Sequence, residues 1–138
     1  MASPSVFLSF DLANNEADRG EFVRQIEGGS VACTVAYWSD NRSPDSESDK
    51  LARDKVGRCT LLIVLVDKRT AHAANVEKEI GFARQMNVPF FGVYVAASED
   101  TIDLPAGLPG NRTIPYDWAR IAAAVTQLMG EGKNHVFR

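Results

Sequence analysis

Three aspartates stand at or just after the ends of apolar runs of strand length: Asp11 after residues 6–10, Asp40 after 31–38 and one serine, and Asp67 after 60–66. Carboxylates placed in this way can bind magnesium and accept a phosphoryl group. That chemistry also needs an acidic pair after the first strand and a lysine after the fifth. Here Asp11 is followed by Leu12, and the last short run leads into Pro115-Tyr116-Asp117. These two departures argue against a phosphoacceptor domain.

Glycine-rich phosphate loops and metal sites are not indicated either. The first run leads into Asp11-Leu12-Ala13-Asn14, which matches neither GxGxxG nor GxxxxGK[ST]. The chain has only two histidines, and its cysteines, Cys33 and Cys59, lie in or beside apolar runs without CxxC spacing. We therefore expect no metal ligands, and we expect both thiols to be reduced packing residues.

Two glutamates occupy a segment with helical spacing, residues 71–86, whose apolar positions are 73, 76, 80 and 83. A helical wheel places Glu77 and Glu79 on opposite flanks of this stripe. Glu79 shares its flank with Asn75 and aromatic or sulfur-containing residues, whereas Glu77 shares its flank with Gly81 and Arg84. The pattern favours Glu79 as the residue of a pocket wall, although a glutamate on a helix flank is usually a solvated charge.

Strand-length runs alternate with helical segments along the whole chain. Strands are predicted over 6–10, 31–38, 60–66, 88–95 and 113–114, and helices over about 14–27, from 48 to near Gly57, 71–86 and 117–129. A polar loop (39–48) whose Asp45 and serines can cap the next helix, and a surface loop (96–111), join them. This alternation predicts a single flavodoxin-like, three-layer α/β domain: a five-stranded parallel sheet with helices on both faces.

Ligands of such sheets bind beyond the carboxyl ends of the strands. We therefore expect Asp11, Asp40, Asp67 and Glu79 to gather near one edge of the sheet. Structural roles compete with this expectation at several positions. Phe10 can be a core residue, Trp38 can be either a lid over the core or a stacking platform, and Asp11 can cap the first helix. Residues 67–69 can form a solvated turn.

Composition excludes several classes of function. The chain has 138 residues, 45% of them hydrophobic and 24% charged, which is typical of one globular domain. A net charge of −3 supplies no basic surface for nucleic acid, and no apolar run approaches the length of a membrane span. With no signal peptide visible, we expect a cytoplasmic protein made of one domain, residues 1–138, with its core at about 5–129 and a polar tail at 130–138.

Several motifs together resemble the TIR-like (Toll/interleukin-1 receptor-like) family. The opening Val6-Phe7-Leu8-Ser9-Phe10 is similar to the first strand of that family, and Trp38-Ser39-Asp40 is similar to the Trp-x-Asp of its bacterial branch. Thr70, Val76-Glu77-Lys78-Glu79-Ile80 with Ala83, and the run 87–93 follow that branch in order and spacing. The resemblance covers about residues 5–129, and the branch that it resembles includes the signal-generating TIR proteins of Thoeris anti-phage defence.

The resemblance implies an enzyme that cleaves the nicotinamide–ribose bond of NAD and releases a cyclic ADP-ribose-type signal. It implies Glu79 as the catalytic residue and Phe10, Asp11, Trp38, Asp40 and Asn75 as the substrate-binding residues. NAD is then a substrate and no cofactor is expected, while a separate effector protein reads the product and TIR surfaces allow self-association. The family commonly has a tryptophan where Asn75 stands, and an aromatic residue or histidine near Asp11-Leu12. The competing interpretation is a non-catalytic TIR-like module that binds other proteins.

Overall fold

The computed structural model describes residues 4–40, 46–95 and 103–131. Within these ranges the strands are β1 (Ser5–Ser9), β2 (Thr34–Trp38), β3 (Leu61–Val66), β4 (Phe90–Tyr94) and β5 (Thr113–Ile114). The α-helices are α1 (Glu16–Glu27), α2 (Ser46–Gly57), α3 (Ala74–Gln85) and α4 (Trp118–Glu131). Short 3₁₀ turns, η1 (Thr70–His72) and η3 (Gly110–Arg112), precede α3 and β5.

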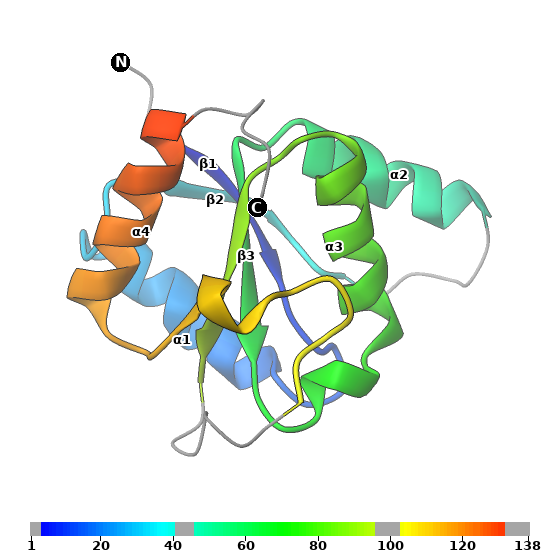
Figure 1. The fold of residues 1–138 in the computed structure, drawn as a ribbon, viewed down its shortest axis with the longest axis horizontal. Helices are drawn as coiled ribbons and strands as arrows, with labels where there is room; N and C mark the ends of the chain where they lie inside the picture. Colours follow the sequence, from blue (N-terminus) through cyan, green and yellow to red (C-terminus); the bar gives the residue numbers. More distant parts are fainter. Residues whose placement is uncertain (1–3, 41–45, 96–102, 132–138) are drawn as a thin grey trace.

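All five strands are parallel, in the order β2-β1-β3-β4-β5 (Figure 1). The order reverses between β1 and β3, so the chain winds first to one side of the sheet and then to the other. This confirms the flavodoxin-like α/β fold predicted from the alternation of strands and helices. The reversal also places the ends of β1 and β3 at the position where such folds bind their ligands.

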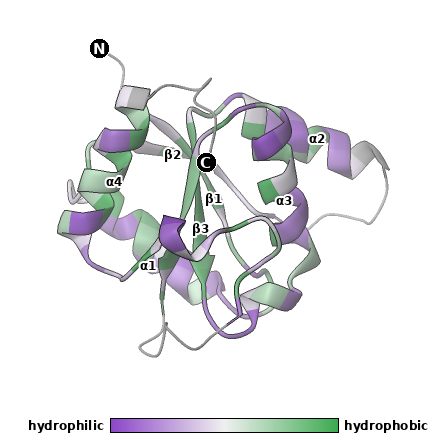
Figure 2. Cartoon of the chain, in the orientation of Figure 1, coloured by the Kyte–Doolittle hydropathy of each residue, from purple (hydrophilic) through white to green (hydrophobic). Residues whose placement is uncertain are grey.

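Two apolar layers enclose the sheet. One face carries α1 and α4, with Phe10, Phe22 and Ile121 in its core. The opposite face carries α2 and α3, with Phe7, Val56 and Ile80 in its core. All six residues of β3 are buried, as expected for a central parallel strand covered on both sides. Figure 2 shows the hydrophobic colour concentrated along the strands and the hydrophilic colour along the outer sides of the helices.

The pairing of β1 with β2 contains an irregularity. Val6 pairs with Val35, but the next residue, Phe7, pairs with Tyr37, so Ala36 is an extra residue in β2. A one-residue insertion of this kind is a β-bulge, which shifts the register of everything that follows it. Beyond the bulge Leu8 pairs with Trp38.

The largest boundary differences from the sequence predictions have local causes. β2 begins at Thr34 and not at Val31, because Cys33 N–H bonds back to the Val31 carbonyl in a turn. The predicted strand 88–95 begins only at Phe90, since Val88 N–H bonds to the Ala83 carbonyl at the end of α3. The segment 71–86 is a 3₁₀ turn followed by α3. The predicted tail from 132 onward, the caps in 41–45 and the loop residues 96–102 lie outside the described residues.

Other predictions concern the thiols, the later loop and the membrane. Cys59 is buried and Cys33 half-buried, both are thiols outside any disulfide, and burial raises the pKa of the Cys33 thiol to about 11. The prediction of packing thiols is therefore confirmed. The described part of the later loop is not wholly superficial, because Leu108 is buried against the core beside α3. Among the described residues, none of the helices has the length and apolar character needed to cross a membrane.

Candidate functional site

Glu79 is completely buried, although it lies on a helix flank where a solvated charge is the usual outcome. Its Oε1 accepts two hydrogen bonds from serine hydroxyls, at 2.7 Å from Ser9 Oγ and at 2.6 Å from Ser39 Oγ. Ser9 ends β1 and Ser39 directly follows β2, so the two donors come from neighbouring strands. Glu77, two residues away, is exposed. The two flanks of the helix therefore differ in burial as the helical pattern indicates, whereas the place of Glu79 in the wall of a pocket stays a prediction.

The alternation of side chains along the strands explains why the serines meet Glu79. Neighbouring residues of a strand point to opposite faces of the sheet. Phe7 and Ser9 face α3, whereas Phe10 is packed in the core on the α1 and α4 face. Phe10 is thus a core residue, and it contacts this site through its peptide group and not through its ring.

The backbone of Phe10 is held on both sides. Its N–H donates to Ser39 Oγ at 3.1 Å, and its carbonyl accepts a hydrogen bond from Asn75 Nδ2 at 2.9 Å. Asn75 lies one helical turn before Glu79 on α3. The contacts therefore close a ring that runs from Asn75 through the Phe10 peptide and Ser39 to Glu79. We call this set of four residues the Glu79 ring.

Trp38 and Asp40 flank Ser39 but do not join the Glu79 ring. The Trp38 side chain is 39% exposed, and the Arg19 guanidinium lies 4.7 Å above its ring centre, so Trp38 is not a lid over the core. Asp40 forms an ion pair with Lys55 of α2, with 3.2 Å between Nζ and Oδ2. Trp38, Asp40 and Lys55, with Ala36 and Tyr37, line an open hollow of about 230 Å³ at the end of β2. This hollow combines an aromatic surface with one charge of each sign.

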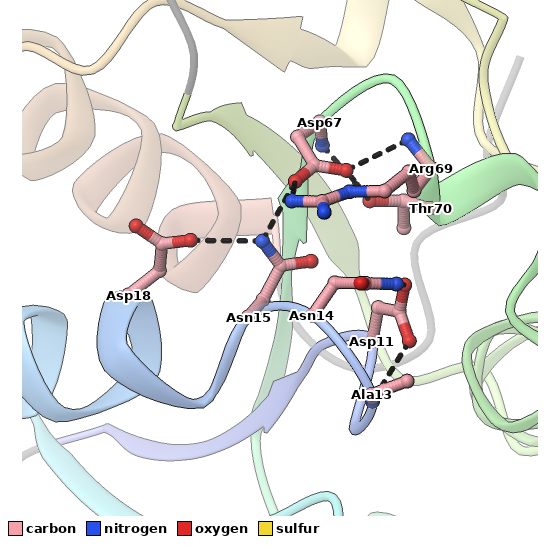
Figure 3. A network of polar contacts seen from close by, with 8 residues as sticks. All are labelled: Asp11, Ala13, Asn14, Asn15, Asp18, Asp67, Arg69 and Thr70. Carbon is pink, nitrogen blue, oxygen red and sulfur yellow. Dashed lines mark hydrogen bonds and ion pairs between the residues drawn. The ribbon is translucent and has the colours of Figure 1, made fainter.

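A second polar network occupies the ends of β1 and β3 (Figure 3). Asn15 Nδ2 donates to carboxylate oxygens of both Asp18 and Asp67, each at 2.8 Å. Asp67 also accepts hydrogen bonds from the backbone N–H and the guanidinium of Arg69, and its own N–H donates to Thr70 Oγ1. Asp67 is only 6% exposed, so the prediction of a solvated turn over 67–69 is wrong for this residue and holds only for the exposed Lys68 and Arg69.

The electrostatics of Asp67 follow from these contacts. Burial opposes its negative charge, but the hydrogen bonds from Asn15 and Arg69 together outweigh burial and lower the pKa of Asp67 below its ordinary value of 3.8. Asn15 Oδ1, on the other side of the same amide, is buried and has no hydrogen-bond partner within the part of the chain that the structure describes. Its amide orientation is fixed because both hydrogens of Nδ2 are needed by carboxylates.

Asp11 organises the turn between β1 and α1. Its Oδ1 accepts from Ala13 N–H at 3.0 Å and its Oδ2 accepts from Asn14 Nδ2 at 2.6 Å. A side chain that bonds to the backbone two residues later forms an Asx turn. The suggestion that Asp11 caps the first helix is therefore wrong, because the residue at the N-cap position of α1 is Asn15.

The contacts divide the four predicted carboxylates among three groups. Glu79 belongs to the Glu79 ring, Asp40 to the hollow, and Asp11 and Asp67 to the two ends of the network in Figure 3. The four carboxylates thus lie along the edge of the sheet formed by the carboxyl ends of the strands, as expected, but they do not contact one another directly. Within the described ranges no three or more histidine, cysteine, aspartate or glutamate side chains are grouped so that they could hold a metal ion.

Sequence reasoning missed the residues that hold the carboxylates. Ser9, Ser39 and Asn15 are buried polar residues, and each bonds to a carboxylate from another element or turn. The signal for Ser9 is that it is the one hydroxyl in the apolar run 6–10, because such a group must find a partner when buried. Ser39 and Asn15 lie in polar stretches, where no comparable signal marks them.

Comparison with known proteins gives no further identification. No protein-family model matches the chain, and no curated protein is similar enough to count as a match. The arrangement of the buried carboxylate, the two serines and the hollow therefore carries the functional interpretation.

Proposed function

We propose that this protein is a TIR-like enzyme that cleaves the nicotinamide–ribose bond of NAD, with Glu79 as the catalytic residue. The observation that carries this proposal is the buried Glu79 carboxyl, held by Ser9 and Ser39 at the carboxyl ends of β1 and β2. Burying an acidic side chain completely at the edge of an α/β sheet where ligands bind lowers the stability of the fold. It is the kind of feature that active sites retain.

A single carboxylate is chemically sufficient for this reaction. Ordinary glycosidases need a second carboxyl group to protonate a poor leaving group. Nicotinamide leaves from a pyridinium as a neutral molecule, so no general acid is required. The remaining task is to stabilise the positive charge that develops on the ribose, which one preorganised carboxylate can do.

Ser39, whose hydroxyl donates to Glu79, stands in the chain between Trp38 and Asp40, two of the residues that line the hollow at the end of β2. Trp38 offers a surface on which a nucleotide base can stack, Asp40 an acceptor for ribose hydroxyls, and Lys55 a cation for the phosphates. Asp11 shapes the neighbouring turn. In this proposal Asn75 acts on the site through Phe10, and it occupies the position where the family commonly has a tryptophan.

Glu79 has no exposed surface, so ribose reaches it only after the groups that cover it move aside. We therefore expect slow turnover by the dilute protein and faster turnover in a triggered or self-associated state. Attack by water on the ribosyl cation gives ADP-ribose, whereas attack by a hydroxyl of the same molecule gives a cyclic product. A covered site favours the second route because it excludes water. The cyclic product then signals to a separate effector protein in bacterial anti-phage immunity.

The test is to incubate the purified protein with NAD, at low and high protein concentration, and to follow nicotinamide and nucleotide products by liquid chromatography and mass spectrometry. Glu79→Gln removes the charge while keeping the size of the side chain, so nicotinamide release should fall by at least about a hundred-fold. Glu77→Gln is the matched control, since Glu77 lies on the same helix and is exposed. Equal activity of Glu79→Gln and wild type would refute the role of Glu79.

A second candidate function is a non-catalytic TIR-like module that binds other proteins. The observation in its favour is the exposure of three large apolar side chains, Trp38, Leu51 and Tyr116. In that case the Glu79 ring is only a structural brace. Absence of nicotinamide release at every protein concentration, combined with self-association that Trp38→Ala weakens, would support this alternative over the enzyme.

A further inference from the structure

Two side chains of the Glu79 ring, those of Ser39 and Asn75, are each held by the backbone of Phe10. Ser39 is 1% exposed, and its hydroxyl has one proton. Because Ser39 Oγ accepts the Phe10 N–H at 3.1 Å, that proton is directed to Glu79 Oε1 at 2.6 Å. The backbone amide of β1 thus fixes which way the serine donates.

The direction of donation matters for the carboxyl group. Because the Ser39 oxygen already accepts a hydrogen bond, its proton is left to donate to the Glu79 carboxyl oxygen. Hydrogen bonds to a charged acceptor are about twice as strong as those between neutral groups. Ser9 Oγ donates to the same oxygen at 2.7 Å. Ser39 Oγ also accepts a hydrogen bond from the backbone N–H of Phe10, which removes the rotational freedom that a hydroxyl otherwise keeps.

Asn75 completes the constraint from the other side. Its Nδ2 donates to the Phe10 carbonyl at 2.9 Å, and it lies four residues before Glu79, one turn away on the same helix. A shift of α3 along the sheet would therefore stretch both Asn75–Phe10 and Glu79–Ser39. The Phe10 peptide serves as the common reference for helix and carboxylate.

We propose that Ser39 and Asn75 are positioning residues that hold the Glu79 carboxylate in its productive orientation, with the Phe10 peptide as the fixed point between them. This inference rests on the proposed NAD-cleaving function, and it assigns Asn75 to orientation of Glu79 and not to contact with substrate. A positioning residue affects the chemical step, whereas a residue that only contacts bound substrate affects KM.

The test compares kcat and KM for NAD in wild type, Ser39→Ala, Asn75→Ala and Ser30→Ala, together with the thermal unfolding of each. Ser30, which follows α1, is the control, because its hydroxyl donates to the side chain of Gln25 and takes no part in the Glu79 ring. We expect Ser39→Ala to lower kcat about 10- to 100-fold with KM within about two-fold of wild type. Asn75→Ala should lower kcat about three- to ten-fold, again without a matching change in KM.

Each outcome decides the proposal. If Ser39→Ala does not fold, Asn75→Ala carries the test, since Asn75 is only half-buried. Unchanged kcat in a folded variant, or a rise in KM alone, overturns the positioning role while leaving the proposed function intact, provided that wild type releases nicotinamide and Glu79→Gln does not. A wild-type protein that is inactive under all conditions overturns both.

Discussion

The side-chain amide of Asn15 donates a 2.8 Å hydrogen bond to the carboxylate of Asp67, which lies 52 residues further along the chain. The same nitrogen also bonds to Asp18. One neutral amide therefore bridges the carboxylate of Asp67, at the end of β3, and the carboxylate of Asp18, in the first turn of α1. This arrangement determines how the edge of the sheet responds to mutation and to pH.

Replacing Asn15 should destabilise the fold strongly. Asn15→Ala removes two hydrogen bonds to charged acceptors and should reduce the free energy of unfolding by about 2–4 kcal/mol. Asn15→Asp should cost more at neutral pH, because it places a third carboxylate against Asp18 and Asp67. Urea denaturation measures both effects, with Asn14→Ala as an exposed neighbouring control that costs about 1 kcal/mol or less. If Asn15→Asp unfolded at neutral pH with the same free energy as the wild type, the placement of Asn15 between Asp18 and Asp67 would be contradicted.

Stability at acidic pH should depend on Asp67. Because the folded-state pKa of Asp67 is below its ordinary value of 3.8, the native state binds fewer protons than the unfolded chain in this range. The contribution of Asp67 is therefore complete above the unfolded pKa and is lost as pH falls through the folded pKa. Asp67→Asn lacks this contribution, so its deficit relative to wild type should shrink as denaturation is measured at progressively lower pH. A deficit that stays constant with pH would argue against the charge of Asp67 as its cause.

Two glycines should respond in opposite ways to alanine. A Cβ on Gly92 of β4 would lie 2.8 Å from Leu108 Cδ2 and 3.1 Å from Thr113 Cγ2, so Gly92→Ala should destabilise by about 1–3 kcal/mol. A Cβ on Gly81 of α3 meets nothing within 4 Å, so Gly81→Ala should stabilise by about 0.5–1 kcal/mol through helix propensity. Thermal unfolding of both variants checks the pair. Destabilisation by Gly81→Ala would contradict the open space that surrounds this position.

Removal of the aromatic surface of the hollow should weaken substrate binding. On the proposed function, Trp38→Ala removes a stacking partner of the nucleotide and should raise KM for NAD about ten-fold, with a smaller effect on kcat. Leu51→Ala is the control, because Leu51 is a large apolar residue that is 55% exposed and does not line the hollow. Steady-state kinetics of nicotinamide release measures both. The same KM in Trp38→Ala and wild type would remove the hollow from the substrate path.

The sequence was sufficient to predict the fold because its strongest signals come from burial. The run Leu61–Val66 has no polar residue, and a helix such as α3 repeats its apolar positions at helical spacing. These patterns survive tertiary folding, since the layers of the sheet need them. Strand ends were less predictable. Val31 and Val88 are as apolar as the residues that follow, and only backbone hydrogen bonds to nearby turns exclude them from β2 and β4.

The candidate site was predictable in its position but not in its contacts. Helical spacing distinguished Glu79 from Glu77, because burial depends on the face of the helix. The partners of Glu79 depend on which strands are neighbours and on their register, and neither property is encoded locally. For the same reason the amide of Asn15 could not be assigned to Asp67. The contact between Arg19 and the ring of Trp38 is not encoded locally either, because Arg19 reaches the ring from α1.

The bulge at Ala36 determines how the pairing of β1 with β2 would respond to a deletion in β2. Since Leu8 pairs with Trp38, the residues one position further along are Ser9 and Ser39, both directed at Glu79. If Ala36 instead paired as a regular residue of β2, Trp38 would stand opposite Ser9 and its indole would point at the buried carboxyl. Loss of the single codon for Ala36 would remove the bulge but keep Tyr37 opposite Phe7 and Trp38 opposite Leu8, so both serines would stay directed at Glu79. Among relatives of this protein, a second strand that is one residue shorter is therefore compatible with a preserved site.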